Sequence, residues 1–314
     1  MDSGLSIVIE VLCEPRLHEP VLLNEVLKVL EPQPGQVIID ATLGSGGHAL
    51  EILKRIGSKG HLIAIDRDPD AIERAKPILR AFPQVDYVRQ NFSELDKILE
   101  CLNIKSVNAV ILDVGLSTEQ LEEAQRGFSF LKDGPLDMRM DPEGPVRAWD
   151  LVNGLAQREL ETLFGTYGEE RWAKRIAGAI CRRRMEKPID TTKELAQIVQ
   201  IAVPSRFRFG PRHPATRVFQ ALRIWVNQEL EALENVLVKV LPVLQPGGRL
   251  AVITFHSLED RIVKRRFREW SQAGFVRILT RKPLRPADEE IHRNPRCRSA
   301  KLRAVEKVFR SEDQ

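Results

Sequence analysis

The residues with the clearest chemical signature form a glycine-rich loop, Asp40-Ala-Thr-Leu-Gly-Ser-Gly-Gly-His48, and Asp66 follows further along the chain. The loop stands where a predicted strand, residues 36–41, passes into a predicted helix, residues 47–56, and its glycines allow the backbone to approach a ligand closely. Ligands of open parallel sheets bind beyond the carboxyl ends of the strands, where a carboxylate such as Asp66 can accept hydrogen bonds from both ribose hydroxyls. The pattern predicts a nucleoside-cofactor site.

The choice of nucleoside depends on the glycine spacing and on Asp40. The run Gly44-Ser-Gly-Gly-His48 lacks the G-x-G-x-x-G spacing of a dinucleotide site. Asp40 would repel a pyrophosphate but suits the ammonium group of a methionine moiety. These features favour S-adenosylmethionine over a nicotinamide cofactor, and a purely structural glycine turn is the remaining alternative. Phe92 follows the third predicted strand, where its ring could lie against adenine or belong to the hydrophobic core. Asp113 ends the fourth predicted strand. It either faces the crevice where methyl donor and acceptor should meet or has only a buried capping role.

The elements that must position these residues alternate along the chain. Strands are expected at residues 36–41, 61–65, 85–89, 107–112, 249–255, 276–279 and 302–308, and helices at 20–30, 47–56, 68–82, 92–102, 215–241 and 258–273. Such alternation predicts a parallel sheet with helices on both faces. The alternation of strands and helices stops at residues 116–214, where the sequence predicts loops and then helices such as 169–186 and 192–203. We therefore predict an α/β fold in which an inserted all-α domain (residues 116–214) interrupts the sheet domain (residues 1–115 and 215–314).

The composition and the positions of the cysteines limit the class of protein to which the chain can belong. Of the 314 residues 43% are hydrophobic and 29% charged, as in ordinary globular proteins. The four cysteines lie far apart with no CxxC spacing, so we expect neither a disulfide framework nor a metal site. An apolar stretch at residues 5–12 is broken by Glu10 and is too short for a secretory core or a membrane span. The expected location is the cytoplasm.

Basic residues gather in the second half of the chain, although the net charge is only +4. The clusters are Arg182-Arg183-Arg184; Arg206, Arg208 and Arg212; Lys264-Arg265-Arg266 with Arg268; and Arg293, Arg296, Arg298, Lys301 and Arg303. Clusters of this kind attract a phosphate backbone, because each neutralised phosphate releases counterions. Solvated helix faces are the alternative.

Longer runs of the sequence closely resemble the RsmH (formerly MraW) family of bacterial 16S ribosomal RNA (cytosine-N4)-methyltransferases. They extend in order from His18 to about Val308. Besides the glycine loop they are His18-Glu-Pro-Val-Leu-Leu-Asn-Glu25, Ala64-Ile-Asp-Arg-Asp-Pro69, Arg126-Gly-Phe-Ser-Phe130, Asp133-Gly-Pro-Leu-Asp-Met-Arg-Met-Asp141, Tyr167-Gly-Glu-Glu170, His213-Pro-Ala-Thr-Arg217, Phe219-Gln-Ala-Leu-Arg-Ile-Trp-Val-Asn227 and Phe255-His-Ser-Leu-Glu-Asp-Arg-Ile-Val263. The resemblance implies S-adenosylmethionine-dependent N4-methylation of a cytidine in the decoding centre (P-site region) of 16S ribosomal RNA. It also implies a Rossmann-like class I S-adenosylmethionine methyltransferase sheet, with the inserted all-α domain as the substrate-recognition domain.

Residue roles follow from the resemblance by position. It implies cofactor contacts by Gly46, Gly47, His48, Asp66, Phe92, Asp113 and Gln120. One departure is visible, because the family usually reads Asp-Leu-Gly-Val-Ser-Ser-Pro-Gln where this chain has Asp113-Val-Gly-Leu-Ser-Thr-Glu-Gln120. Without the proline we expect a looser loop before Gln120. The implied partner is 16S ribosomal RNA in the small ribosomal subunit, with no membrane and with homodimer formation left open.

The chemistry of methyl transfer suggests further candidates. The lone pair of a cytosine N4 is delocalised into the ring, so alignment and electrostatics should dominate catalysis. The Asn- or Asp-Pro-Pro-aromatic motif of many amino-methyltransferases is absent after the fourth strand. Candidate catalytic residues are Asp113, Ser117 and His256, and candidate substrate contacts are Asp137, Arg139, Asp141, His213, Arg217 and Ser257. His256 could equally be a neutral histidine that fixes a turn. The rival functions are methylation of another acceptor and a catalytically silent RNA-binding factor.

Overall fold

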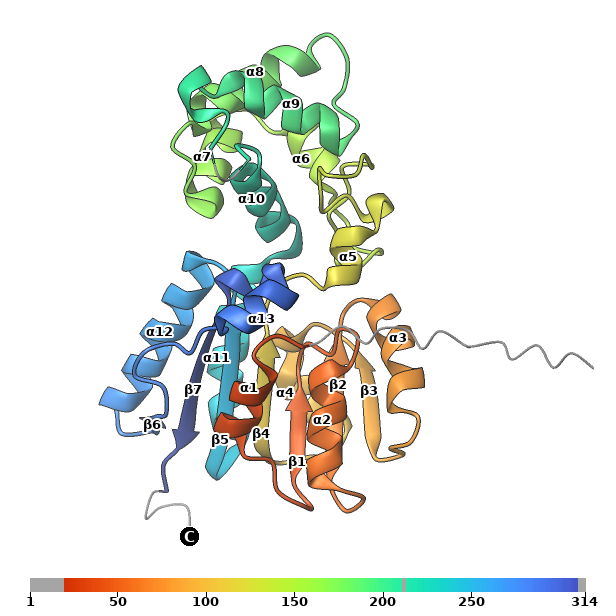
Figure 1. The fold of residues 1–314 in the computed structure, drawn as a ribbon, viewed down its shortest axis with the longest axis vertical. Helices are drawn as coiled ribbons and strands as arrows, with labels where there is room; N and C mark the ends of the chain where they lie inside the picture. Colours follow the sequence, from red (N-terminus) through yellow and green to blue (C-terminus); the bar gives the residue numbers. More distant parts are fainter. Residues whose placement is uncertain (1–19, 211–212, 310–314) are drawn as a thin grey trace, which may run out of the picture.

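The computed structural model describes residues 20–210 and 213–309, and a seven-stranded sheet forms its base (Figure 1). The strands are β1 (Val37–Asp40), β2 (His61–Asp66), β3 (Val85–Arg89), β4 (Val107–Asp113), β5 (Leu244–Thr254), β6 (Val276–Ile278) and β7 (Lys301–Lys307). Their order is β3-β2-β1-β4-β5-β7-β6. Strands β1 to β5 pair in parallel, and β7 is antiparallel to both β5 and β6. The predicted α/β sheet is confirmed. Its strand order turns at β1 and β4, so a crevice opens at their carboxyl ends.

Helices cover both faces of this sheet. One face carries α1 (Leu23–Leu30), α2 (Gly47–Ile56) and α3 (Pro69–Leu79), and the other carries α4 (Leu95–Cys101), α11 (Glu229–Val243) and α12 (Ser257–Gln272). Successive strand residues point to opposite faces, so Ile38 packs in the first layer and Ile39 in the second. Both are fully buried, which explains why the central strands read as nearly continuous apolar runs.

The helical insert lies beyond the carboxyl ends of the strands, between β4 and β5 in the sequence (Figure 1). Its elements are α5 (Thr118–Glu122), α6 (Ala148–Gly154), α7 (Gln157–Gly168), α8 (Ala173–Arg184), α9 (Thr192–Ala202) and α10 (Thr216–Asn227), with the 3-10 turns Ala124–Arg126 and Ser205–Phe207. Side chains such as Leu160, Phe164, Ile176 and Leu195 form a separate hydrophobic core. The predicted all-α insertion is confirmed.

The single helix expected at residues 215–241 is wrong, because the chain forms two helices there. Helix α10 ends at Asn227, and α11 begins at Glu229 after Gln228, whose φ of 50° lies in the left-handed region. The two helices serve different cores: Leu222 of α10 packs inside the insert, whereas Val236 of α11 packs against the sheet. The division of the chain at residues 115 and 214 stays a prediction.

The last part of the chain crosses above the sheet before β7. Helix α13 (Asp288–Arg293) and the 3-10 turn Pro295–Ser299 occupy the stretch between β6 and β7, for which the sequence predicts neither a helix nor a strand. Oε1 of Glu290 accepts a hydrogen bond from the Leu22 backbone N–H at 2.8 Å, which ties this segment to the start of α1. No helix in the described ranges is both long and apolar enough to span a membrane. The apolar stretch at residues 5–12 lies outside those ranges.

Candidate functional site

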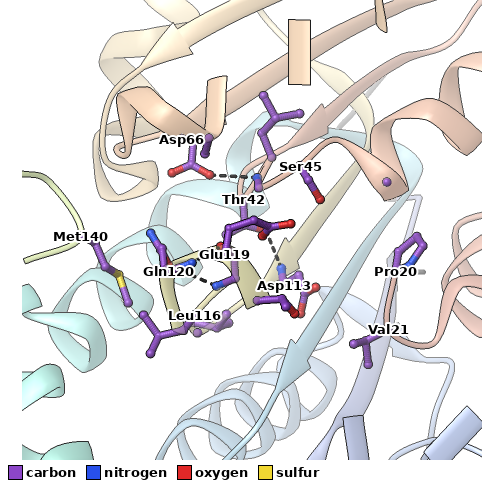
Figure 2. Close-up of a pocket in the computed structure, with 18 of the residues that line it drawn as sticks. Pro20, Val21, Thr42, Ser45, Asp66, Asp113, Leu116, Glu119, Gln120 and Met140 are labelled. Carbon is purple, nitrogen blue, oxygen red and sulfur yellow. Dashed lines mark hydrogen bonds between the residues drawn. The ribbon is translucent and has the colours of Figure 1, made fainter. Parts of the chain in front are cut away.

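A cavity of about 300 Å³ opens at the carboxyl ends of β1, β2 and β4 (Figure 2). Its walls are Pro20 and Val21, residues of the 41–48 loop, Asp66 and Arg67, Gln90 and Phe92, residues 113–121, and Met140, Arg223, Glu229, Phe255, Asn294 and Arg296. In the view of Figure 2, Pro20 and Val21 lie on one side of the cavity and Met140 on the other. The cavity therefore lies in the predicted crevice, between the sheet and the insert, and its size is at the lower end of small-molecule sites.

The glycine loop forms the floor of this cavity and begins α2. Gly46 is the N-cap of α2 with a φ of 82°, and a Cβ there would stand 3.2 Å from the Cβ of Ala75. Gly47 lines the cavity, and a Cβ on it would stand 2.8 Å from Cγ of Pro20. Gly46 is thus needed for the turn, and Gly47 for the close approach of the Pro20 segment to the cavity wall.

Asp66 ends β2 and holds the edge of the loop. Its Oδ2 accepts a hydrogen bond from the Gly44 N–H at 2.9 Å, and its Oδ1 accepts one from the Asp68 N–H at 2.9 Å. Burial is the largest influence on this carboxyl group and raises its pKa. Because a carboxylate oxygen can accept more than one hydrogen bond, Asp66 is oriented by the backbone and keeps acceptor capacity toward the cavity. Phe92, which begins the 3-10 turn Phe92–Glu94, lines the cavity as well.

Two acids, the buried Asp40 and the half-buried Asp113, end the neighbouring strands β1 and β4. The Asp113 N–H donates to Oγ1 of Thr42 at 2.6 Å, while Oδ1 of Asp113 and Oδ2 of Asp40 are buried and have no hydrogen-bond partner among the described residues. Burial raises the pKa of Asp113 to about 8 and that of Asp40 to about 7. His48 donates from Nε2 to the Val21 carbonyl at 3.0 Å, and burial lowers its pKa to about 4. Asp40 lies behind the cavity wall, whereas His48 and Asp113 line it.

Ser117 and Gln120 form a capping box at the start of α5. Oγ of Ser117 accepts from the Gln120 N–H at 3.2 Å, and Oε1 of Gln120 accepts from the Ser117 N–H at 3.1 Å. Nε2 of Gln120 donates to Oδ2 of Asp68 at 2.7 Å, and Asp68 also pairs with the buried Arg126. These hydrogen bonds and the ion pair hold the loop before Gln120, where the family's usual proline is missing. They offset the loosening of that loop that we expect from the loss of the proline.

His256 and Ser257 do not line this cavity, although Phe255 before them does. His256 caps α12: its Nδ1 accepts from the Glu259 N–H at 3.4 Å, and its Nε2 lies 3.0 Å from Oε1 of Glu259. Ser257 donates from Oγ to Oε2 of Glu169 in the insert at 2.8 Å. The alternative prediction for His256, a histidine that fixes a turn, therefore agrees with its contacts.

Glu229, His256 and Glu259 bring possible metal-ligand atoms within 4.8 Å of one another, the one such group in the described ranges. Arg223 donates two hydrogen bonds to Glu229, both at 2.8 Å. A guanidinium group thus already supplies positive charge to this cluster. The expectation of no metal site stays a prediction.

The candidate substrate contacts in the insert also lie outside the first cavity. Arg139 pairs with Asp137 at 2.7 Å, and Asp141 pairs with Arg89 at 3.2 Å. Arg139 and Asp141 border a second, neighbouring pocket of about 450 Å³, which shares Arg67 and Gln90 with the first. The second pocket therefore lies beside the first cavity rather than inside it.

His213 and Arg217 lie at the start of α10, away from both pockets. The His213 ring packs against the Phe130 ring at a tilt of 35° with 4.7 Å between centroids, and its Nδ1 accepts from the Ala215 N–H at 3.1 Å. Arg217 donates to the Glu169 carbonyl at 2.9 Å. Their contacts in the structure organise the insert.

Sequence reasoning missed several residues of the cavity wall. Thr42 anchors Asp113, and Arg67 donates from its guanidinium group to the Asn227 carbonyl at 2.8 Å. Met140 reaches the cavity from the insert, where Asn227 accepts its N–H at 2.7 Å. The only signal for these residues was their place in runs shared with the family, because each makes its contact with a distant part of the chain.

The class of protein follows from the sheet and the cavity together. Parallel strands completed by an antiparallel β7, a glycine turn after β1 and a carboxylate at the end of β2 define a class I S-adenosylmethionine-dependent methyltransferase. The model of the MraW methylase family matches residues 16–308, and this chain belongs to that family. The resemblance seen in the sequence is confirmed.

Relatives match along nearly the full chain. The ribosomal RNA small subunit methyltransferase H of Halothermothrix orenii is 45% identical over 307 residues, which cover 93% of this chain and 99% of that protein. The protein of the same name from Geobacter sulfurreducens is 48% identical, with 93% of this chain and 99% of that protein covered. A solved structure of a putative rRNA-methylase from Clostridium thermocellum aligns with 94% of this chain and all of that chain, at a TM-score of 0.47 and 11% identity. The assignment therefore rests on the family model and the relatives.

Proposed function

We propose that this protein transfers the methyl group of S-adenosylmethionine to the N4 amine of a cytidine in the decoding centre (P-site region) of 16S ribosomal RNA. The observation that carries the proposal is 45–48% identity, over nearly the whole chain, to proteins named ribosomal RNA small subunit methyltransferase H. The substrate partner is accordingly the small ribosomal subunit. We also propose that the protein acts in the cytoplasm, where this substrate is assembled.

The residues of the first cavity fit the cofactor. Asp66 is positioned to accept hydrogen bonds from ribose hydroxyls, and Phe92 supplies an aromatic face for adenine. The unpartnered Oδ1 of Asp113, which lines the cavity, gives this end an acceptor for a cationic group, and Asp40 adds a carboxyl group behind the wall. When bound, S-adenosylmethionine supplies an electrophilic methyl group. Gly47, His48 and Gln120 line the cavity around it, and Gly46 makes the turn into α2 behind them.

Asp113 is the best candidate to act on the acceptor amine. Its Oδ1 is free to accept a hydrogen bond from an N4 amine as positive charge develops on that nitrogen. Ser117 is committed to the capping box, and His256 is committed to Glu259. Because burial raises the pKa of Asp113 to about 8, this group can also hold the proton that leaves the amine.

The second pocket is the proposed place for the neighbouring part of the RNA. An exocyclic amine in structured RNA is reached only when the base is single-stranded or extruded. The second pocket shares Arg67 and Gln90 with the cofactor cavity, and Arg89 and Arg139 border it. Asp137 and Asp141 hold these two arginines in place. This arrangement supports roles for Arg139 and Asp141 beside the methyl acceptor.

The test is a methyl-transfer assay with tritiated S-adenosylmethionine. Small subunits from cells without this gene, free 16S ribosomal RNA and total protein are offered as acceptors, and the product nucleoside is identified by mass spectrometry. We expect label in N4-methylcytidine at one position of the RNA. Label in protein or in another nucleoside contradicts the proposal, and tight cofactor binding without transfer to any acceptor supports the silent-factor alternative.

Homodimer formation stays a prediction for the protein in solution. Sedimentation velocity over a range of concentrations tests it directly. A mass near 35.7 kDa at all concentrations would contradict the dimer.

A further inference from the structure

We propose that five residues of the insert form a docking surface for a single-stranded segment of the RNA substrate, separate from the methyl-transfer site. The residues are Arg171, Trp172, Arg175, Arg206 and Phe207, here called the arginine-ring surface. The inference rests on the proposed function, because it takes RNA to be the substrate. It adds an RNA-binding surface outside the cofactor cavity and the second pocket, because none of the five residues lines either of them.

Two rings and three guanidinium groups alternate on this surface. The ring centroids of Trp172 and Phe207 are 5.6 Å apart. The guanidinium carbon of Arg171 lies 5.1 Å from the Trp172 centroid and 5.9 Å from that of Phe207. Arg175 lies 5.9 Å from the Trp172 centroid, and Arg206 lies 4.7 Å from the Phe207 centroid. Cation–π contacts therefore hold three positive charges together in one place.

The charges of this surface are not neutralised by neighbouring acids. In the described ranges, none of Arg171, Arg175 and Arg206 has a carboxylate within salt-bridge distance, and all three are exposed. Phe207 is 39% exposed. The exposed Lys174 adds a fourth positive charge between Arg171 and Arg175 in the sequence. This surface thus presents uncompensated charge together with accessible aromatic area.

The other basic clusters of the chain differ in this respect. Arg183 pairs with Glu194 at 2.7 Å, and Arg184 donates to the Val152 and Leu155 carbonyls. Arg265 and Arg266 pair with glutamates, and Lys301 and Arg303 pair with Asp260. Most of these basic side chains stabilise the fold and have less charge to offer a ligand.

The surface begins beside the contact between the insert and the sheet. Glu169, just before Arg171, accepts hydrogen bonds from Ser257 and Arg261 of α12. Helix α12 follows β5 at the carboxyl edge of the sheet, where Phe255 lines the cofactor cavity. The arginine-ring surface thus starts two residues after Glu169, which joins the insert to the helix that follows Phe255 of the cavity wall.

RNA fits this surface better than an acidic protein segment does. Guanidinium groups bind phosphates through charge-assisted hydrogen bonds, and planar guanidinium and aromatic faces stack on bases whatever their sequence. A carboxylate-rich peptide would use the charges but leave the rings without partners. The alternation of rings and cations matches the alternation of bases and phosphates in a single strand.

The test compares two triple variants with the wild type. In the first, Arg171→Gln, Arg175→Gln and Arg206→Gln remove the three charges. In the matched control, Lys54→Gln, Arg55→Gln and Arg80→Gln remove three exposed charges at the ends of α2 and α3, remote from the insert. Binding of fluorescent poly(U), of 16S ribosomal RNA and of small subunits is measured at several salt concentrations. Cofactor affinity and single-turnover methyl transfer at saturating RNA are measured beside it.

We expect the first variant to bind RNA at least tenfold more weakly and to lose about 2 from the slope of log K against log salt, because each single-strand phosphate contact contributes about 0.7. Cofactor affinity and the single-turnover rate should stay at wild-type values, and the control variant should change little. Replacing the same arginines by lysine should restore the slope but not the full affinity, because lysine keeps the charge and loses the planar stacking.

The outcomes separate this inference from the proposed function. If the wild type methylates small-subunit RNA and the glutamine variant keeps both its RNA affinity and its salt slope, the docking surface is wrong. Binding of poly-L-glutamate by the wild type as tightly as poly(U), with loss of both in the glutamine variant, would overturn the assignment to RNA. If the wild type methylates no ribosomal RNA at all, the proposed function fails whatever the binding data give.

Discussion

His48 and Asp113 face each other on the wall of the cofactor cavity, with Nδ1 of the histidine 3.9 Å from Oδ2 of the aspartic acid. Burial lowers the pKa of His48 to about 4 and raises that of Asp113 to about 8. At neutral pH, in the protein without cofactor, a neutral imidazole therefore stands beside a protonated carboxyl group. The two neutral groups therefore interact through packing and through their dipoles, and they do not form an ion pair.

Asp113→Asn should stabilise the protein without cofactor at alkaline pH. The pKa of Asp113 is about 8 in the folded state and about 3.9 in an unfolded chain, so the folded state holds its proton more tightly. The contribution of this group to stability is therefore fully present at low pH, falls as the pH rises from about 4 to about 8, and is constant above. The variant should gain roughly 2–5 kcal/mol over the wild type at pH 8.5 and little at pH 4.5. Urea unfolding at both values checks this, and an equal difference at the two would contradict it.

Binding of S-adenosylmethionine should release a proton near neutral pH. A sulfonium cation favours the ionised form of Asp113, so affinity should rise with pH up to about 8 and level off above. Calorimetry in two buffers of different ionisation enthalpy measures the proton directly. S-adenosylhomocysteine, which lacks the sulfonium charge, should show a smaller effect, and Asp113→Asn should remove most of it. A pH-independent wild-type affinity would refute this coupling.

Asp66→Ala should lower cofactor affinity by at least about 100-fold, because a bidentate acceptor of ribose hydroxyls is lost. Asp66 also accepts the Gly44 and Asp68 N–H groups, so the alanine variant loosens the loop as well. Asp66→Asn keeps one oxygen and serves as the graded comparison, with an intermediate affinity expected. Circular dichroism checks that the fold is retained. Wild-type affinity of the alanine variant would exclude the ribose assignment.

Asn227→Asp should destabilise the junction between insert and sheet by about 2–4 kcal/mol. Asn227 is buried, and its Nδ2 donates to the Met138 carbonyl at 2.7 Å and to the Arg223 carbonyl at 2.9 Å. An aspartate cannot donate either bond and places a charge beside two carbonyl oxygens. Asn91→Asp is the matched control, because within residues 20–210 and 213–309 the Asn91 side chain uses only its Oδ1, as an acceptor from the Ser93 N–H. Equal unfolding midpoints of the two variants in urea would contradict this role.

Arg183→Ala should weaken the insert by about 1 kcal/mol and leave RNA binding nearly unchanged, because Arg183 is paired with Glu194. This result would differ from the expectation drawn from the Arg182-Arg183-Arg184 run alone. Arg182→Ala, at an exposed neighbouring position, serves as the comparison and should leave stability unchanged. Thermal unfolding and the salt slope of RNA binding measure the two effects. A loss of slope in Arg183→Ala without loss of stability would restore the earlier expectation.

The parts of the fold that could be predicted are those that depend on the order of neighbouring residues in the sequence. Strands β1, β2 and β4 are short apolar runs that are buried on both faces. The turn after β1 can be predicted because its sequence is rich in glycine. The break between α10 and α11 could not be predicted. No glycine or proline marks Gln228, and the turn is held by Asn227 and Arg67, which bond to distant segments.

The same distinction holds for the site. Asp66 and Asp113 could be named because each ends a buried strand, and strand ends meet at one edge of a parallel sheet. Thr42 and Met140 could not, because their roles depend on which segments the tertiary fold brings together. A run of arginines in the sequence likewise indicates positive charge but does not indicate which groups those arginines contact. Only the structure separates Arg184, which bonds two carbonyl oxygens of the insert, from Arg171, which rests on a ring.

The insert leaves the sheet after β4 and returns to it at β5, and these two strands are neighbours. The chain therefore departs and re-enters at adjacent points, as a domain inserted into an older gene would. The sheet and the donor cavity need no change in strand order to accept a longer, shorter or different insert at this point. In evolutionary terms, target recognition can diversify here while the sheet's part of the donor cavity, with Asp66 and Asp113, is inherited intact, provided that the insert keeps its own part of the wall, with Gln120 and Met140.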